Sequence, residues 1–468
     1  MESDSKNKGE QGIRLYNTQS RKIDQIIPEH GKKIRIFVCG PTVYDFIHIG
    51  NARTFVFFDS LVRYLRSSGY LVFYLQNITD VDDKIINKAN EEKKDVMDVS
   101  SFYLSEFIRD MNSLRVESVN LYARTSLFIG EIIEQIERLI KSGHAYVSDD
   151  GVYFSVSSFP DYGKLSGQKI DNLIAGARVT ADRRKKNPED FVLWKFRKTG
   201  EPFWWSPWGE GRPGWHIEDT AITEFFFGKS YDVHGGGIDL LFPHHESENA
   251  QMRSISGMDY LAKYWIHVGM LSMGEGKMSK SVGNIIKVRD ILSEFSAEDI
   301  RFFLLNSGYR NTIEFSVKAL RESSVTRKRI QNLYDILTRE HENSGLILEG
   351  NEETERIWKE LEDDFDTRSF FRDLLAYVSR IFKDMENLGK DELGAALYML
   401  TLTDSVFCIL KGREASSDIS DFINSMIELR NQMRKVGKFD VSDMIRKALE
   451  DAGVVVEDSK GETKWRMS

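Results

Sequence analysis

The chain has 468 residues, 41% of them hydrophobic and 29% charged, which is a composition typical of soluble globular proteins. A single core does not serve a chain of this length, so we expect about three domains. The 64 basic and 73 acidic residues give a net charge of −9, which excludes indiscriminate binding of nucleic acid. Any contact with nucleic acid must therefore use local basic patches.

The apolar stretches predict no membrane span. The sequence starts with polar residues and has no apolar signal core there. The longest apolar stretch, residues 393–410, is interrupted by two threonines and Asp404, so it predicts a buried helix. Cys39 and Cys408 are the only cysteines, which permits at most one disulfide. This suits a reducing cytoplasm, where we expect the protein to be located.

The first clear pattern along the chain is a strand, a helix and a strand. Residues 32–40 predict a buried strand, residues 52–69 a helix with apolar residues at helical spacing, and residues 70–79 a second strand. This βαβ order predicts a parallel sheet with a right-handed crossover. Such sheets bind ligands beyond the carboxyl ends of their strands, where the loop 40–51 begins.

The next part of the chain, about residues 115–200, predicts an α/β subdomain inserted into the sheet domain. Its elements are an amphipathic helix, a hairpin with an Asp-Gly turn and a short strand, within residues 126–143, 144–156 and 185–195. The sheet pattern then resumes with a strand, a helix and a strand, at residues 231–237, 243–255 and 264–273.

The rest of the chain predicts two further domains. Beyond residue 300 the apolar residues recur with a helical period, which predicts a helical bundle over 301–412. Residues 413–468 predict a small α/β module of two helices and two short strands. The fold class expected is therefore α/β, with a Rossmann-like parallel-sheet domain over 1–300 that carries the insertion.

The segment 241–250 contains two histidines and two glutamates. Pro243 suits the first turn of a helix, so His244 and Glu248 are predicted to lie one turn apart on one face. That spacing suits two ligands of one metal ion. On these residues alone, a solvated helix face is the more common alternative.

Two other segments have residue types that suit a nucleotide. His48 and Gly50 follow the first strand, where the next helix points its positive N-terminus and a glycine lets a phosphate approach the backbone. Lys277 and Lys280 lie in a glycine-bounded loop, 275–284, and a lysine is a compact charge on a flexible stem that suits a moving triphosphate. A structural loop histidine and a solvated basic turn are the alternatives for each segment alone.

Together these segments resemble the two signatures of the class I aminoacyl-tRNA synthetases, His48–Asn51 after the first strand and Lys277–Ser281 after the last. Asn51 stands where that family has a second histidine, and its amide still donates a hydrogen bond to phosphate. The resemblance is most specific to the cysteinyl-tRNA synthetase family and runs from about Arg14 to the C-terminus. It rests on long strings in the family's order, among them 38–59, 77–85, 211–218 and 232–251.

This resemblance implies a ligase that activates L-cysteine with ATP and Mg²⁺ to cysteinyl adenylate and pyrophosphate. The cysteinyl group then moves to the 3′ end of tRNA(Cys), and AMP is released. The implied protein is a monomer with no membrane partner. The catalytic residues implied are His48, Lys277 and Lys280; the ATP-binding residues are Thr42, His48, Gly50, Asn51 and Lys280; the substrate-binding residues are Cys39, Thr79, Trp215 and His234.

In the same family one zinc ion lies in the cysteine pocket. The ligands implied here are Cys39, Asp219, His244 and Glu248. Asp219 stands where the family has a cysteine; zinc accepts a carboxylate, but we expect weaker binding than with two thiolates. A zinc ion on the substrate thiolate would select cysteine over serine. We expect His245 and Glu246 to lie on the surface or to support the ligands.

The resemblance also implies that the C-terminal module binds the anticodon. Its basic and aromatic residues suit unstacked bases; they are Arg430, Arg434, Lys435, Lys438, Lys464, Trp465 and Arg466. The module is near neutral overall, so plain solvation is the alternative. The basic residues 327–329 are a second candidate contact with tRNA, with plain solvation as the alternative.

Two other functions fit part of the pattern. A related ligase that joins activated cysteine to an amino sugar lacks the final module, which this chain has. A non-catalytic nucleic-acid-binding relative has no need for His48 and Lys280, which are both present.

The lysine loop makes a direct prediction. Lys280→Ala should lower the rate of adenylate formation about 10²–10³-fold, because removing one contact made mainly in the transition state costs about that much. The measurement is cysteine-dependent ATP–pyrophosphate exchange, with circular dichroism to show that the fold is intact. Exchange at a near-normal rate in the variant would rule out this role.

Overall fold

The computed structural model describes residues 12–168, 185–273, 286–411, 416–435, 437–451, 454–459 and 462–467. It divides into two compact units, one that ends at Leu410 and one that begins at Lys411. Within the described residues, no helix has both the length and the apolar character needed to cross a membrane.

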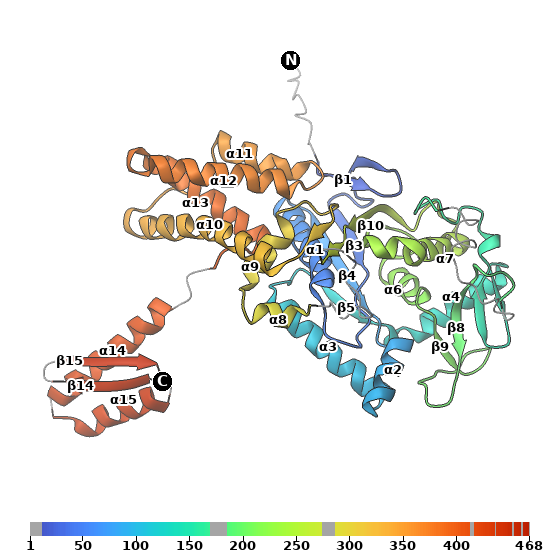
Figure 1. Cartoon of the computed structure of the whole chain (residues 1–468), viewed down its shortest axis with the longest axis horizontal. Helices are drawn as coiled ribbons and strands as arrows, with labels where there is room; N and C mark the ends of the chain where they lie inside the picture. The colour runs from blue at the N-terminus through green and yellow to red at the C-terminus, as the bar shows by residue number, and fades with distance from the viewer. Residues whose placement is uncertain are drawn as a thin grey trace, which may run out of the picture. The chain divides into compact units, whose positions relative to one another are not determined.

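A five-stranded parallel sheet forms the centre of the first unit, in the order β11-β10-β3-β4-β5 (Figure 1). Its strands are β3 (Lys33–Val38), β4 (Leu71–Ile78), β5 (Leu121–Arg124), β10 (Tyr231–Gly237) and β11 (Ala262–Val268). Helix α1 (Ile49–Ser67) connects β3 to its parallel neighbour β4. The predicted βαβ unit and the predicted fold class are confirmed.

The strand β3 is buried on both faces, and this decides where the functional residues lie. Ile36 and Val38 pack in the core that contains α1. The alternate residues Phe37 and Cys39 pack in a second core, with residues of α6 (Ile217–Phe227) and α7 (Glu246–Ser256). Successive side chains of a strand point to opposite faces. The alternation therefore places Cys39 on the α6–α7 face.

The insertion has a sheet and a core of its own. Helix α4 (Ile129–Lys141) packs against a four-stranded antiparallel sheet of β6 (Ala145–Val147), β7 (Gly151–Phe154), β8 (Phe191–Phe196) and β9 (Gly211–Pro213). The predicted helix, hairpin and strand are confirmed. Because β5 belongs to the main sheet and β9 to the inserted one, the insertion begins and ends later than residues 115 and 200.

Further helices extend the first unit beyond the two sheets. They are α9 (Ala297–Leu305), α10 (Val317–Ser344), α11 (Glu352–Lys359), α12 (Thr367–Asp384) and α13 (Lys390–Phe407). Helix α13 is the buried helix predicted from the longest apolar stretch, and most of its large apolar side chains lie in the core, whereas Tyr398 is exposed. The predicted boundary between residues 300 and 301 falls inside α9, because the packing of this helix on α1 continues the sheet domain into the bundle.

The first unit contains several other elements besides these. They are the hairpin β1 (Arg14–Asn17) and β2 (Lys22–Gln25), helices α2 (Asp83–Glu92), α3 (Val96–Ser113) and α8 (Val288–Leu292), and the paired strands β12 (Leu271–Ser272) and β13 (Ile313–Glu314). The second unit has helices α14 (Ser416–Lys435) and α15 (Phe439–Asp451) and the antiparallel strands β14 (Val454–Ser459) and β15 (Glu462–Met467). The two helices and two strands predicted for this module are confirmed.

A buried ion pair connects the sheet domain to the helical bundle. The Arg301 guanidinium of α9 donates to Asp59 Oδ2 of α1 at 2.8 Å and to the carbonyl oxygen of Phe407 at 2.6 Å. Burial alone would raise the pKa of Asp59, but the Arg301 and Arg63 guanidiniums and a hydrogen bond from Ser118 hold this pKa below its ordinary value. The carboxylate therefore stays charged and pairs with Arg301.

This pair predicts a large effect on stability. Asp59→Asn should lower the free energy of unfolding by about 3–5 kcal/mol, because it leaves the Arg301 charge buried without its partner. Glu322→Gln is the matched control, since its pair with Lys318 is exposed and should contribute about 1 kcal/mol or less. The measurement is urea unfolding followed by tryptophan fluorescence. Equal losses in the two variants would contradict the structural role of Asp59.

Candidate active site

A cavity of about 340 Å³ lies at the carboxyl ends of the central strands. Ligands of open parallel sheets bind in this position. Nine of the residues expected to bind substrate, ATP or metal line it: Cys39, Thr42, His48, Gly50, Asn51, Thr79, Trp215, Asp219 and His244. The cavity thus brings together residues from distant parts of the sequence.

His48 caps the helix that begins at the cavity. Its Nδ1 accepts a hydrogen bond from the backbone N–H of Asn51 at 3.2 Å, and the Asn51 side chain accepts one from the backbone N–H of His48. A Cβ atom on Gly50 would lie 2.9 Å from His48 Nδ1, so glycine permits this close approach. The cap directs the positive end of a long helix toward the cavity, which favours an anion there.

The lysine loop, with Lys277 and Lys280, lies outside the described residues. Its two described flanks lie at the cavity. Leu271 lines the cavity, and on the other flank the carbonyl oxygen of Ile286 accepts a hydrogen bond from the backbone N–H of Ile49 at 3.0 Å. The chain therefore enters and leaves this segment beside the start of α1.

Four possible metal donors meet at the inner end of the cavity. Cys39 follows β3, Asp219 lies in the first turn of α6, and His244 and Glu248 lie on the turn before α7 and on α7 itself. His244 Nε2 is 2.9 Å from Asp219 Oδ2 and 3.1 Å from Glu248 Oε1, which confirms that His244 and Glu248 share a helix face. One donor atom from each of the four lies within 4.8 Å of the others. We call Cys39, Asp219, His244 and Glu248 the outer set.

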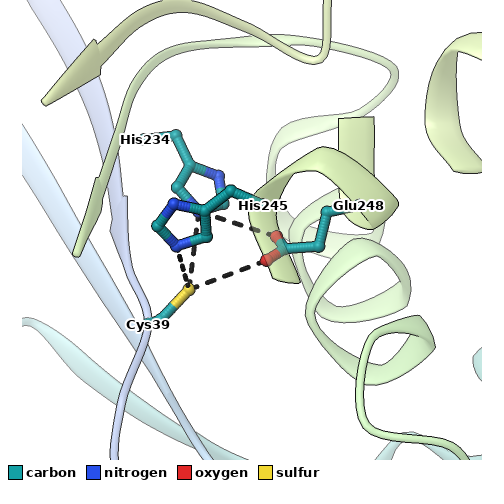
Figure 2. Close-up of side chains that lie close together, drawn as sticks. All are labelled: Cys39, His234, His245 and Glu248. Carbon is teal, nitrogen blue, oxygen red and sulfur yellow. Dashed lines mark hydrogen bonds and ion pairs between the residues drawn. The ribbon is translucent and has the colours of Figure 1, made fainter. Parts of the chain in front are cut away.

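His234 and His245 complete a second arrangement of donors. Figure 2 shows both rings beside Cys39 and Glu248, and these four also have donor atoms within 4.8 Å of one another. We call Cys39, His234, His245 and Glu248 the inner set. A Cβ atom on Gly236 would lie 2.8 Å from the His245 ring, so the glycine run in β10 makes room for this ring.

Of the two positions expected for His245 and Glu246, the surface is excluded, since both side chains are fully buried. His245 lies next to Cys39, and Glu246 accepts a hydrogen bond from the backbone N–H of Ser166 at 2.8 Å. Helix α7 is covered on more than one face, which the spacing of His244 and Glu248 did not reveal. His234 is also fully buried, and its ring stacks on Trp265 behind Cys39, with 4.2 Å between the ring centroids.

Four of the donor side chains, Cys39, Glu248, His234 and His245, have strongly shifted pKa values. Burial raises the pKa of the Cys39 thiol well above its usual range, and the Glu248 and Asp219 carboxylates add to this rise. Burial, followed by the charge of Asp219, also raises the pKa of Glu248. Burial lowers the pKa of His234 and His245, so both imidazoles are neutral. The cluster therefore holds acids that ionise with difficulty and bases that stay uncharged.

These donors fit a divalent metal ion. Among the described residues, the ion pairs recorded for Asp219 and Glu248 are with histidines only, and Glu248 Oε2 is buried without a hydrogen-bond partner. A divalent cation would supply the missing positive charge and allow thiol and carboxyl to lose their protons. Thiolate, imidazole and carboxylate are the ligand types that zinc accepts.

Other residues at the cavity differ in their accessibility. Trp215 is 38% exposed and covers His244, with ring centroids 4.4 Å apart. The Thr79 hydroxyl donates to Glu218, a buried acid that pattern reasoning missed because an acid beside Asp219 is typical of a surface. Burial raises the pKa of Glu218 well above its usual value. The residue after Thr79, Asp80, is buried and pairs with Arg124 at 2.9 Å.

Two of the basic residues expected to contact tRNA are structural. Arg327 is 3% exposed and donates to Asp299 at 2.6 Å and to the carbonyl oxygen of Ile409. Arg430 is 1% exposed. Both guanidiniums are therefore unavailable to a nucleic acid, whereas Arg434 and Lys435 on α14 are exposed.

Comparison with known proteins agrees with the fold. Residues 25–325 match the model of the tRNA synthetases class I (C) catalytic domain, and residues 416–466 match the cysteinyl-tRNA ligase anticodon binding domain. The cysteine–tRNA ligase of Thermoplasma acidophilum is 49% identical over 453 residues, which cover 97% of this chain and 100% of the relative. That of Carboxydothermus hydrogenoformans is 40% identical over 464 residues, again 97% of this chain and 100% of the relative.

Solved structures show the same architecture at low sequence identity. The Mycobacterium tuberculosis methionyl-tRNA synthetase in complex with methionyl-adenylate superposes with a TM-score of 0.60 at 15% identity, over 84% of this chain and 94% of that one. The fold and the family match define a class I tRNA synthetase. Within that class, the chain belongs to the cysteine–tRNA ligase family, as its nearly full-length similarity to these relatives shows.

Proposed function

We propose that this protein activates L-cysteine with ATP and Mg²⁺ and transfers the cysteinyl group to the 3′ end of tRNA(Cys). It acts as a monomer in the cytoplasm, with one zinc ion in each chain. Ligation of cysteine to tRNA is the activity of the family to which the chain belongs. One observation supports this proposal most strongly. A capped helix N-terminus and metal-donor residues line the same cavity.

The first step joins cysteine to the nucleotide. A carboxylate oxygen of cysteine attacks the α-phosphorus of ATP, and pyrophosphate leaves in line with it. Such a displacement depends on positioning and on stabilising the charge of the transition state. His48, Gly50 and Asn51 at the start of α1 hold the phosphates against the helix N-terminus. Lys277 and Lys280 supply positive charge to the leaving pyrophosphate.

The second step moves the cysteinyl group to a hydroxyl of the terminal ribose of tRNA, and AMP is released. Thr42 lines the cavity on the nucleotide side, and Thr79 and Trp215 form walls for the amino acid. Trp215 lines the cavity and is 38% exposed, so its ring shields a bound adenylate from part of the solvent and slows its hydrolysis. His234 is not among the residues that line the cavity, and it acts through its contact with Cys39, which does line it.

Selectivity for cysteine comes from the inner end of the cavity. Cys39, Asp219 and His244 line it, so the side chain of a bound cysteine reaches them. A zinc ion there supplies a Lewis acid that binds a thiolate in preference to the harder oxygen of serine. A site built for one such group rejects analogues that lack it by large factors.

Exposed basic residues of the second unit support its contact with the anticodon. Arg434 and Lys435 at the end of α14, and Lys438 just beyond it, are exposed close together in sequence. Trp465 packs partly on the small core of this unit.

Two free cysteines, Cys39 and Cys408, suit a reducing cytoplasm.

The experiment that tests this function uses the purified full chain. ATP–pyrophosphate exchange should depend on cysteine, and charging should be specific for tRNA(Cys) among the tRNAs of a cell. Exchange with cysteine but transfer to an amino sugar in place of tRNA would identify the related sugar ligase. Absence of exchange in a folded, metal-loaded protein would contradict the proposal.

Removing the second unit should separate the two steps. A chain that ends at Leu410 should keep cysteine-dependent exchange, because every adenylation residue lies before that position. Its charging of tRNA(Cys) should fall about 10²-fold or more, since linked binding modules raise affinity by about that factor. Both reactions are measured on the same preparation. Loss of both activities in a soluble, folded truncation would contradict the assignment of cysteine activation to the first unit alone.

Asp219→Cys should tighten the binding of zinc. A thiolate is a softer ligand than a carboxylate, so we expect the dissociation constant to fall about tenfold or more, which is about 1.4 kcal/mol. Competition with a chromophoric chelator measures it. Asp239→Cys is the control, because Asp239 lines the same cavity outside the donor cluster. Equal zinc affinity in Asp219→Cys and the wild type would exclude Asp219 as a ligand.

A further inference from the structure

We propose that Lys84 is a further substrate-binding residue of the adenylation reaction. Its ammonium binds the carboxylate of cysteine and, once the adenylate forms, the α-phosphate that is joined to it. Lys84 lies in the first turn of α2 and lines the cavity. The inference rests on the proposed function, because it assigns one more residue to the same reaction.

The acids on the wall of the cavity disfavour an anionic substrate unless a cation balances them. These acids are Asp45, Asp219 and Asp239, of which Asp45 pairs with Lys287 at 3.6 Å. Lys84 is the only lysine or arginine among the described residues that line the cavity. ATP and the carboxylate of cysteine both carry negative charge, which acids repel and a cation attracts. Lys84 is therefore the described lysine or arginine that a substrate in the cavity meets directly.

Two aromatic rings place the Lys84 ammonium at the amino-acid end of the cavity. Its Nζ lies 5.5 Å from the centroid of the Tyr44 ring and 6.0 Å from that of the Trp215 ring, and both rings line the cavity. Trp215 in turn covers His244, one of the metal donors. The carboxyl group of cysteine is close to its sulfur in the covalent structure. A cysteine whose thiol reaches the donors therefore keeps its carboxylate on the side of Trp215 and Lys84.

The charge of this ammonium is available to a ligand. An aromatic ring attracts a cation through its quadrupole and does not neutralise it. The two acids that precede Lys84 have other partners: Asp82 accepts a hydrogen bond from the backbone N–H of Lys84 at 2.9 Å, and Asp83 pairs with Arg212 of the inserted sheet. Across the described ranges of the chain, no carboxylate pairs with the Lys84 ammonium.

The place of Lys84 in its helix is electrostatically unfavourable. Asp82 caps α2, so Lys84 lies in the first turn, where the helix presents its positive end. A lysine stabilises a helix at the opposite end. A residue that breaks such a local rule is typical of a functional site. An anion bound at this position is favoured by the end of the helix and by Lys84 together.

In the first step of the reaction this cation lies beside two groups that repel each other. A carboxylate oxygen of cysteine forms a bond to the α-phosphorus. The bond from this phosphorus to the pyrophosphate oxygen breaks, and its electron pair leaves with pyrophosphate. Lys84 transfers no proton. It lowers the repulsion between carboxylate and phosphate as they approach, and it remains beside the charge of the α-phosphate in the adenylate.

Two lysines of the same helix provide a matched pair of variants. Lys84→Met should lower kcat/KM for cysteine about tenfold or more in ATP–pyrophosphate exchange, because one charged contact with the reacting groups is lost. Lys88→Met should leave it nearly unchanged. Lys88 lies one turn further along α2, pairs with Glu92 at 3.2 Å and is not among the residues that line the cavity. Circular dichroism confirms that both variants fold.

Cysteinamide distinguishes a contact with the carboxylate from a purely structural role of Lys84. It has an uncharged amide in place of the carboxylate and otherwise the same groups, so it competes with cysteine for the pocket. Lys84→Met should raise the KM for cysteine and leave the inhibition constant of cysteinamide nearly unchanged. Lys84→Arg, which keeps the positive charge, should restore most of the activity with cysteine.

Three results would contradict these assignments. Equal losses for cysteine and cysteinamide would overturn the inference, as would exchange at the wild-type rate in folded Lys84→Met. Normal exchange with slow transfer to tRNA(Cys) would place Lys84 at the tRNA and would also overturn it. A wild-type protein without cysteine-dependent exchange would instead contradict the proposed function, so the two failures are distinguishable.

Discussion

Burial of three acidic groups in one cluster is the constraint on which the site depends. The Cys39 thiol and the Asp219 and Glu248 carboxyls lie together almost fully buried, beside the neutral imidazoles of His234 and His245. In such a place an acid either keeps its proton or receives a cation. A divalent ion would resolve this conflict and would at the same time present a soft Lewis acid to the cavity. The proposed metal binding and the proposed recognition of cysteine therefore have the same physical origin.

The parallel sheet creates this cluster through simple geometry. Alternation along β3 sends Ile36 and Val38 toward α1 and Cys39 toward α6 and α7. The carboxyl ends of the strands meet at one edge, so residues far apart in sequence line one cavity. The positive end of α1, capped by His48, lies at the same edge. In the proposed function, the nucleotide therefore binds beside the helix N-terminus, which favours anions. The amino acid binds next to it, beside the cluster of metal donors.

Sequence patterns predicted the helices and strands whose apolar residues recur with a clear period, and missed those without such a period. The unit of β3, α1 and β4 followed from apolar runs and a helical repeat, and the spacing of His244 and Glu248 correctly predicted a shared helix face. Helix α6 had no such signal, because its first turn contains Glu218 and Asp219, acids that pattern reasoning assigns to a surface. The burial of His245 could not be predicted because it depends on contacts with distant strands. The resemblance to a family indicated the site residues, including Asp219 in the position of a cysteine. Only the structure revealed that His234 and His245 form a second set of donors with Cys39 and Glu248.

Metal content measured together with amino-acid selectivity tests the central claim most directly. Zinc in the purified protein is quantified, and exchange rates with cysteine and with serine are compared before and after chelation. The account predicts about one zinc per chain and a fall in the cysteine-to-serine ratio of about 10² or more on removal, with the affinity for ATP little changed. A protein that never contains stoichiometric metal and still selects cysteine would contradict it, and the thiol would then be recognised by hydrogen bonds and shape.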